Sequence, residues 1–194
     1  KGHMLVVPYY TAQDNNITVL HVVNTDSKNG KALKVRFRGA ANSDDVLDFT
    51  VFLSPSDVWT GYVSKGSDGL ATFTTGDTSC ILPADVTTGP KSFSLERLSN
   101  SNWSTDVKAN HTREGYVEIL NTADIPAGSA LFTAIKHVSG KAPCTASVMD
   151  AQASDLVAGS ATNAPKVRGY SWPTGGLYAN WILVNTTDKA SFSG

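Results

Sequence analysis

This chain of 194 residues is short of charge and of long apolar runs. Only 17% of its residues are charged and the formal net charge is −1, so no basic surface for nucleic acid is expected. No apolar run approaches the roughly 20 residues of a membrane-spanning helix, so the sequence predicts no membrane span. These absences argue against a nucleic-acid-binding protein and against a helical membrane protein.

The sequence motifs of common enzyme classes are also missing. There is no Gly-x-Ser-x-Gly elbow, no His-Glu-x-x-His helix and no phosphate-binding glycine loop. The four histidines, at positions 3, 21, 111 and 137, lack the spacing of metal ligands. We therefore expect a protein that is not an enzyme and needs no cofactor, and a secreted hydrolase ranks last among the functions considered.

What the sequence does contain is a series of short runs with the period of a β-strand. Apolar and polar residues alternate over residues 33–38 and 47–53, and turn-forming residues at 27–31, 54–57 and 66–69 separate the runs. We expect the Asn-Gly pair at 29–30 to close a hairpin. This spacing predicts an all-β fold, an Ig-like or jelly-roll-like antiparallel β-sandwich, with one domain over residues 1–194.

Three apolar runs share one ending. Residues 19–26, 116–124 and 181–188 each stop at Asn-Thr and then reach an Asp. Asn, Thr and Asp hydrogen-bond their own backbone at turns, so we expect three strands that end in similar corners. The third run lies close to the end of the chain, where we expect no strand to follow it.

One helical insertion is expected at about residues 142–156. This segment is rich in Ala, Ser and Asp, and Pro143 suits a first helical turn. Val148, Met149 and Leu156 are its expected core residues.

The two cysteines lie far apart. We expect Cys80 and Cys144 to form a disulfide, closing a loop of about 65 residues worth roughly 4 kcal/mol. Two unpaired thiols, or a nucleophile assisted by His111 or His137, are the alternatives. A disulfide implies an oxidising compartment, so we expect a secreted or cell-surface protein.

Residues 5–10 form a short apolar run that contains Pro8, which favours an edge strand or an extended arm, with residues 1–10 as the possible arm. An extended arm can complete the sheet of another copy by β-augmentation, which predicts self-association. The donor-arm candidates are Leu5, Val6, Val7, Tyr9 and Tyr10.

Two further groups of residues are candidates for binding. Exposed aromatics stack on sugar rings or anchor interfaces, whereas buried ones close the ends of a sandwich. The aromatic candidates for interface or ligand stacking are Trp59, Tyr62, Trp103, Trp172 and Tyr178. Asp44, Asp45 and Asp48 offer oxygen ligands for calcium, but they lack the glycine and the closing glutamate of an EF-hand loop, so we predict a solvated loop.

Three segments resemble a group of uncharacterised secreted or cell-surface β-sandwich proteins of Gram-negative bacteria. They are residues 33–63, residues 135–140 leading to Cys144, and residues 173–178 leading to Val184 and Asn185. The resemblance implies the compartment and the fold class, and gives no site. The function expected is that of a structural surface protein, a fibre subunit joined by strand exchange or an adhesin module, with a carbohydrate-binding module for a surface glycan as the alternative.

Overall fold

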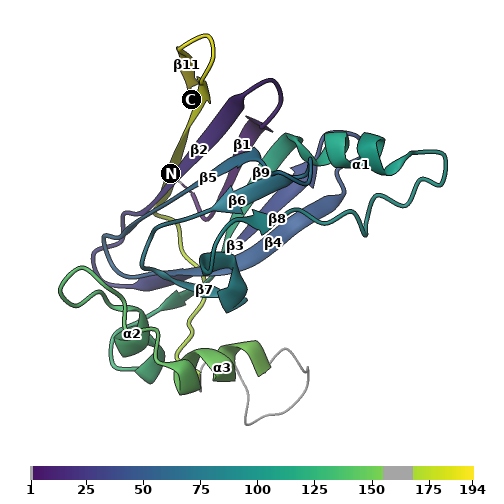
Figure 1. Cartoon of the computed structure of the whole chain (residues 1–194). Coiled ribbons are helices and arrows are strands. Elements are labelled where there is room, and N and C mark those ends of the chain that lie inside the picture. Colours follow the sequence, from purple (N-terminus) through teal and green to yellow (C-terminus); the bar gives the residue numbers. More distant parts are fainter. Residues whose placement is uncertain (1, 155–167) are drawn as a thin grey trace.

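Two antiparallel sheets face each other across a common apolar core (Figure 1). The structure is a computed structural model and describes residues 2–154 and 168–194. The expected all-β sandwich with a short helical insertion is confirmed. No helix among these residues is long and apolar enough to cross a membrane.

Sheet I has the strand order β1-β9-β3-β4-β7. Its strands are β1 (Met4–Thr11), β9 (Glu114–Ile125), β3 (Gly30–Gly39), β4 (Asp45–Leu53) and β7 (Cys80–Leu82). Sheet II has the order β11-β10-β2-β5-β6-β8. Its strands are β11 (Ala190–Ser193), β10 (Leu177–Asn185), β2 (Asn16–Asn24), β5 (Val58–Lys65), β6 (Ala71–Thr74) and β8 (Lys91–Ser92).

The inward residues of the two sheets build the core. Trp59 of β5 packs its ring on Phe49 of β4 and on Phe73 of β6, at centroid distances of 5.8 and 5.6 Å. Tyr10 of β1 contacts Phe37 of β3 edge-on, and all five rings are buried. Offset and edge-on ring pairs of this kind add to the stabilisation that area burial alone provides.

The helices lie at the two ends of the sandwich (Figure 1). At one end is α1 (Thr105–Thr112), which begins where Ser104 Oγ accepts a hydrogen bond from the Val107 amide. At the other end are α2 (Ala130–Ile135) and α3 (Ala146–Ser154), and a 3₁₀ turn, η1 (Ala84–Thr87), follows β7. The sequence did not predict α1, which is too short to carry an amphipathic pattern, and it left residues 131–138, which overlap α2, open between strand and helix.

A second apolar cluster joins α2 and α3 to sheet I. Phe52, from the outer side of β4, is buried together with Leu131 and Ile135 of α2 and Met149 of α3. The Cys80–Cys144 disulfide is present and ties β7 to the segment that leads into α3. The helix begins at Ala146, so Pro143 is not in its first turn, and Leu156 lies outside the described residues.

Several local expectations were wrong. The 27–31 segment is not a hairpin turn, because β2 lies in sheet II and β3 in sheet I. The third Asn-Thr strand is followed by a partner, since β11 pairs with β10. Asn24 and Asn185 do form the expected corners, accepting amide hydrogen bonds from residues 26 and from 187 and 188. Asn121 forms no corner, because β9 continues to Ile125.

Candidate functional site

The outer side of sheet II is apolar over three neighbouring strands. On β2, Leu20 and Val22 point into the core, so Ile17, Val19 and Val23 point outward. The same alternation turns three residues of β10 and two of β5 outward. We call this set the apolar face: Ile17, Val19, Val23, Val58, Tyr62, Tyr178, Ile182 and Val184.

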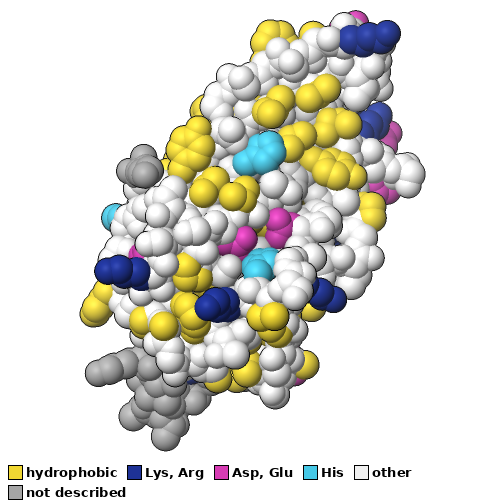
Figure 2. Space-filling view, turned by 90° about the vertical axis from the view of Figure 1, so that its left-hand side faces the viewer, with side chains coloured by type: hydrophobic (Ala, Val, Ile, Leu, Met, Phe, Trp, Pro, Cys, Tyr) yellow, Lys and Arg dark blue, Asp and Glu magenta, His cyan; other side chains and the backbone are white. Residues whose placement is uncertain are grey.

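Strand register arranges these side chains in rows. Val19 stands opposite both Ile182 and Tyr62, and Val23 stands opposite both Tyr178 and Val58. One polar row, containing His21, separates these two rows. Figure 2 shows hydrophobic side chains gathered around a histidine on this side of the molecule. No helix of the described residues covers the apolar face.

Charge is almost absent from these strands. Along β11, β10, β2, β5 and β6, Lys65 at the end of β5 is the only Lys, Arg, Asp or Glu. Tyr178 and Val58 are each 47% exposed and Tyr62 is 38% exposed. Contiguous exposed apolar patches on soluble proteins mark interaction sites, so the apolar face is the candidate functional site.

The outer side of sheet I has the opposite character. Arg38 Nε lies 3.1 Å from Glu118 Oε2 and Arg36 Nε lies 3.8 Å from Asp45 Oδ2. Lys34 pairs with Asp48 in the same ladder of charges. Burial raises the pKa of Asp45 above its usual value, and the neighbouring Asp48 adds to that rise.

The aspartates considered as weak calcium candidates lie in or beside this ladder. Asp45 and Asp48 pair with cationic side chains of β3, and Asp44 adjoins them in the loop before β4. Among residues 2–154 and 168–194, no group of three or more ligating side chains is placed to hold a metal ion. The paired carboxylates are therefore part of a salt-bridged strand surface.

The five aromatic candidates do not form one platform. Trp59 is fully buried in the core, so its prediction as a stacking residue was wrong. Trp103 packs on His111 near α1, with ring centroids 4.3 Å apart. Tyr62 and Tyr178 belong to the apolar face, and Trp172, which is 90% exposed, lies in the loop before β10.

The predicted donor arm is a paired strand of its own sheet. β1 pairs antiparallel with β9 through residues 4–7 and 10–11, and Val7 and Tyr10 are buried in the core. Leu5 packs against that core, whereas Val6 and Tyr9 point outward and are 53% and 41% exposed. The edge-strand alternative is therefore correct, and the free-arm alternative is wrong.

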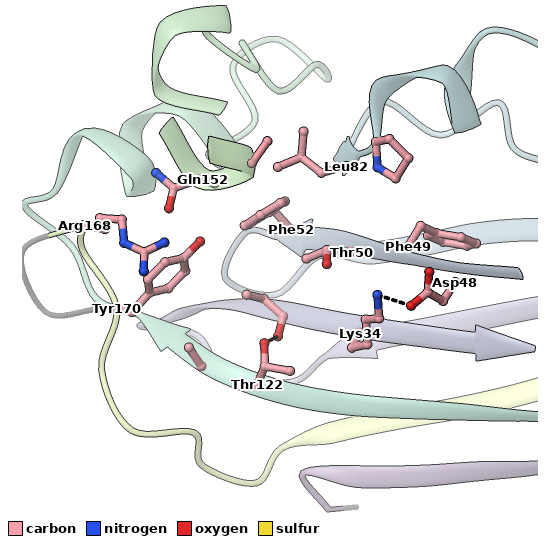
Figure 3. A pocket seen from close by; sticks show the side chains of 14 residues that line it. Lys34, Asp48, Phe49, Thr50, Phe52, Leu82, Thr122, Gln152, Arg168 and Tyr170 are labelled. Atoms are coloured by element: carbon pink, nitrogen blue, oxygen red, sulfur yellow. Dashed lines mark hydrogen bonds and ion pairs between the residues drawn. The ribbon is translucent and has the colours of Figure 1, made fainter. Parts of the chain in front are cut away.

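A pocket of about 530 Å³ lies between α3 and the outer side of sheet I. Figure 3 shows Lys34 and Asp48 paired on its strand side, with Gln152 and Tyr170 across from them. Phe52 and Leu82 supply apolar lining. Lys34 and Asp48 are paired with each other, so their charges are less available to a ligand in the pocket.

The sequence did not predict a polar cluster around His137. His137 Nδ1 lies 3.1 Å from Ser54 Oγ and 3.3 Å from Asp57 Oδ2, and Nε2 lies 3.2 Å from Thr78 Oγ1. Ser54 is only 5% exposed and donates to Asp57, while the Thr78 hydroxyl donates to a backbone carbonyl. The cluster therefore fastens the segment after α2 to the β4–β5 turn. Only the Ser-Pro-Ser-Asp turn hinted at it.

Comparison with family models, curated proteins and solved structures gave no match.

Proposed function

We propose that this chain is a non-enzymatic structural protein of the cell exterior that self-associates through the apolar face. The single observation that carries the proposal is the uncovered apolar outer side of sheet II. A sheet is stable in water when each apolar side is packed against something. The inner side of sheet II is packed on sheet I, and its outer side needs a second partner.

A second copy of the chain is the occupant that fits this surface. A charged partner would find no complementary charge, because Lys65 is the only charged residue on the five strands concerned. Two such faces can pack about 10 Å apart, as the sheets of a sandwich do. The three strands of the apolar face, of eight or nine residues each, span about 30 Å by 14 Å, or roughly 420 Å². Specific interfaces bury about 800 Å² per partner, so a stable dimer must also bury the neighbouring strands β11 and β6.

The same surface supports a role in a fibre or surface layer. Sheet II ends in β11, a strand of four residues that includes Phe192, which is 64% exposed. Face-to-face dimers could join further through the β11 edge. Strand addition, expected at residues 1–10, would then take place at β11. The Cys80–Cys144 disulfide supports an oxidising compartment such as the cell surface.

The carbohydrate-binding alternative is weaker. Glycan stacking needs aromatic rings on one accessible platform. With Trp59 buried and Trp103 packed on His111, the remaining rings are divided between the apolar face, which holds Tyr62 and Tyr178, and the loop before β10, which holds Trp172.

Matched substitutions on the two sheets test the proposal. Ile182 on β10 and Leu120 on β9 are both half-buried and both point outward, one on each sheet. Ile182→Glu places a charge within the apolar face, next to Val19 of its middle strand, and should weaken self-association on the order of a hundredfold, because an unpaired charge would be buried. Leu120→Glu places the same charge near Lys34 and should leave association unchanged.

Sedimentation equilibrium over a wide concentration range measures both variants against the unchanged protein. We expect a dimer or larger species for the unchanged protein and for Leu120→Glu, and a monomer for Ile182→Glu. A monomeric unchanged protein at high concentration, or equal dissociation constants for the two variants, would contradict the proposal.

A further inference from the structure

A lysine is fully buried inside sheet I, next to an asparagine and an aspartate. Lys31 of β3 is 0% exposed, and Asn121 and Asp124 of β9 are 3% and 1% exposed. Lys31 Nζ donates to Asp124 Oδ1 at 2.8 Å, and Asn121 Nδ2 donates to the same oxygen at 2.7 Å. One carboxylate oxygen therefore joins an amine to a side-chain amide.

An irregularity in strand pairing creates this arrangement. Ala32 stands opposite Ala123 and Leu33 stands opposite Asn121, so Thr122 is an extra residue in β9. A bulge of this kind changes the side to which the following residues point, so Asn121 and Asp124 face the interior together. Lys31 stands directly opposite Asp124, so the backbone register itself holds the three side chains together.

We propose that Lys31 and Asn121 form an intramolecular isopeptide bond. The ammonium of Lys31 gives one proton to Asp124, and the neutral Nζ attacks Cγ of Asn121. The new Nζ–Cγ bond forms, the Cγ–Nδ2 bond breaks, and protons from Asp124 and Nζ leave with Nδ2. Amine and amide become a secondary amide and ammonium, so no oxidant, reductant or other reactant is needed.

Three observations support this reaction. Both reacting nitrogens bind one oxygen, and held reactants gain a large effective concentration. Lys31 Nζ donates directly to Asp124, so its proton can pass to that carboxylate, which frees the lone pair of the amine for attack. Asn121 Oδ1 is buried without a hydrogen-bond partner, so the free amide is only half satisfied, and Asp124, once protonated by Lys31, could donate to that oxygen during the attack.

Asp124 itself is the less suitable acyl group. Burial raises the pKa of Asp124, but hydrogen bonds from Lys31, Thr174 and Asn121 outweigh this and leave it below its usual value. An ionised carboxylate resists attack by an amine, so Asp124 serves to carry the proton. Asp26, 4.0 Å from Lys31 Nζ, is too far to replace it.

Intact mass tests the inference, which does not rest on the proposed self-association. The disulfide is first reduced, and the protein is denatured before mass spectrometry. We expect a mass about 17 Da below that of the sequence, equal to one ammonia, and a proteolytic peptide pair joined between residues 31 and 121. Lys31→Met and Asn121→Ala should each restore the full sequence mass of the variant. Lys34→Met, which replaces a half-buried lysine on the outer side of the same strand, should keep the loss.

Two results overturn the bond. A full sequence mass for the reduced, unchanged protein shows that no bond forms. A loss of about 18 Da, with peptides joined between residues 31 and 124, shows condensation with Asp124 in place of Asn121. Both readouts come from the unchanged protein, so they remain decisive if a variant fails to fold.

Discussion

The two sheets share one apolar core, but their outward-facing side chains differ in charge. Sheet I presents a ladder of ion pairs between β3, β4 and β9 and is partly covered by α2 and α3. Sheet II presents the apolar face, and no helix of the described residues covers it. The helices α2 and α3 thus lie against sheet I, whose charged outer side could also face water.

This difference indicates where the chain needs a partner. Charged residues on a strand surface disfavour association, whereas an uncharged apolar sheet surface favours it. The ladder therefore allows one side of the sandwich to stay solvated while the other packs against a second copy. The next three predictions test how far this separation between the sides extends.

The largest effect is expected where inner and outer sides of one strand are compared. Trp59→Ala should destabilise the fold by about 3–5 kcal/mol, because a fully buried ring is removed from the core. Val58→Ala, next to it on the apolar face, should change the stability of the monomer by less than about 1 kcal/mol. Urea denaturation at low protein concentration measures both. A Val58→Ala cost equal to that of Trp59→Ala would show that the apolar face is packed within the monomer.

Much of this contrast was present in the sequence, although its meaning was not. The alternation over residues 33–38 predicted a strand with one charged side, and this is confirmed by β3. The three apolar runs predicted strands and correspond to β2, β9 and β10. Strand period does not tell which strands share a sheet, so the apolar face became apparent only from the structure, where β2 lies between β5 and β10.

The buried polar groups were less predictable. Lys31 reads as an ordinary turn residue after Asn-Gly, and only the bulge at Thr122 brings Asn121 and Asp124 to it. The pairing of Cys80 with Cys144 was predictable because the chain has only two cysteines. The burial of Trp59 was not, since its run could place the ring on either side of a strand.

A second effect, smaller than that of Trp59→Ala, tests whether the helices α2 and α3, which cover part of sheet I, are independent of the apolar face. Replacing both Cys80 and Cys144 by Ala should cost roughly 2–4 kcal/mol, because the cross-link across 64 residues no longer restricts the unfolded chain. The loss should loosen α3 from sheet I without changing the dissociation constant of the dimer. Thermal denaturation and sedimentation equilibrium measure these two quantities. A parallel loss of association would show that the cover and the apolar face are coupled.

The smallest effect tests whether ion pairs on the outer side of sheet I compensate for the burial of Asp45. Burial first, and repulsion from Asp48 second, raise the pKa of Asp45, so the folded protein holds that proton to a higher pH than the unfolded chain does. The contribution of Asp45 to stability is therefore greatest below about pH 3.8 and falls as pH rises through the raised pKa. Asp45→Asn removes this term, and its stability relative to the unchanged protein should rise between pH 3 and pH 7, by less than about 1 kcal/mol. Urea denaturation at several pH values measures the difference. A difference that falls with pH would mean that Arg36, 3.8 Å away, outweighs burial and that the ladder on sheet I is stabilising throughout.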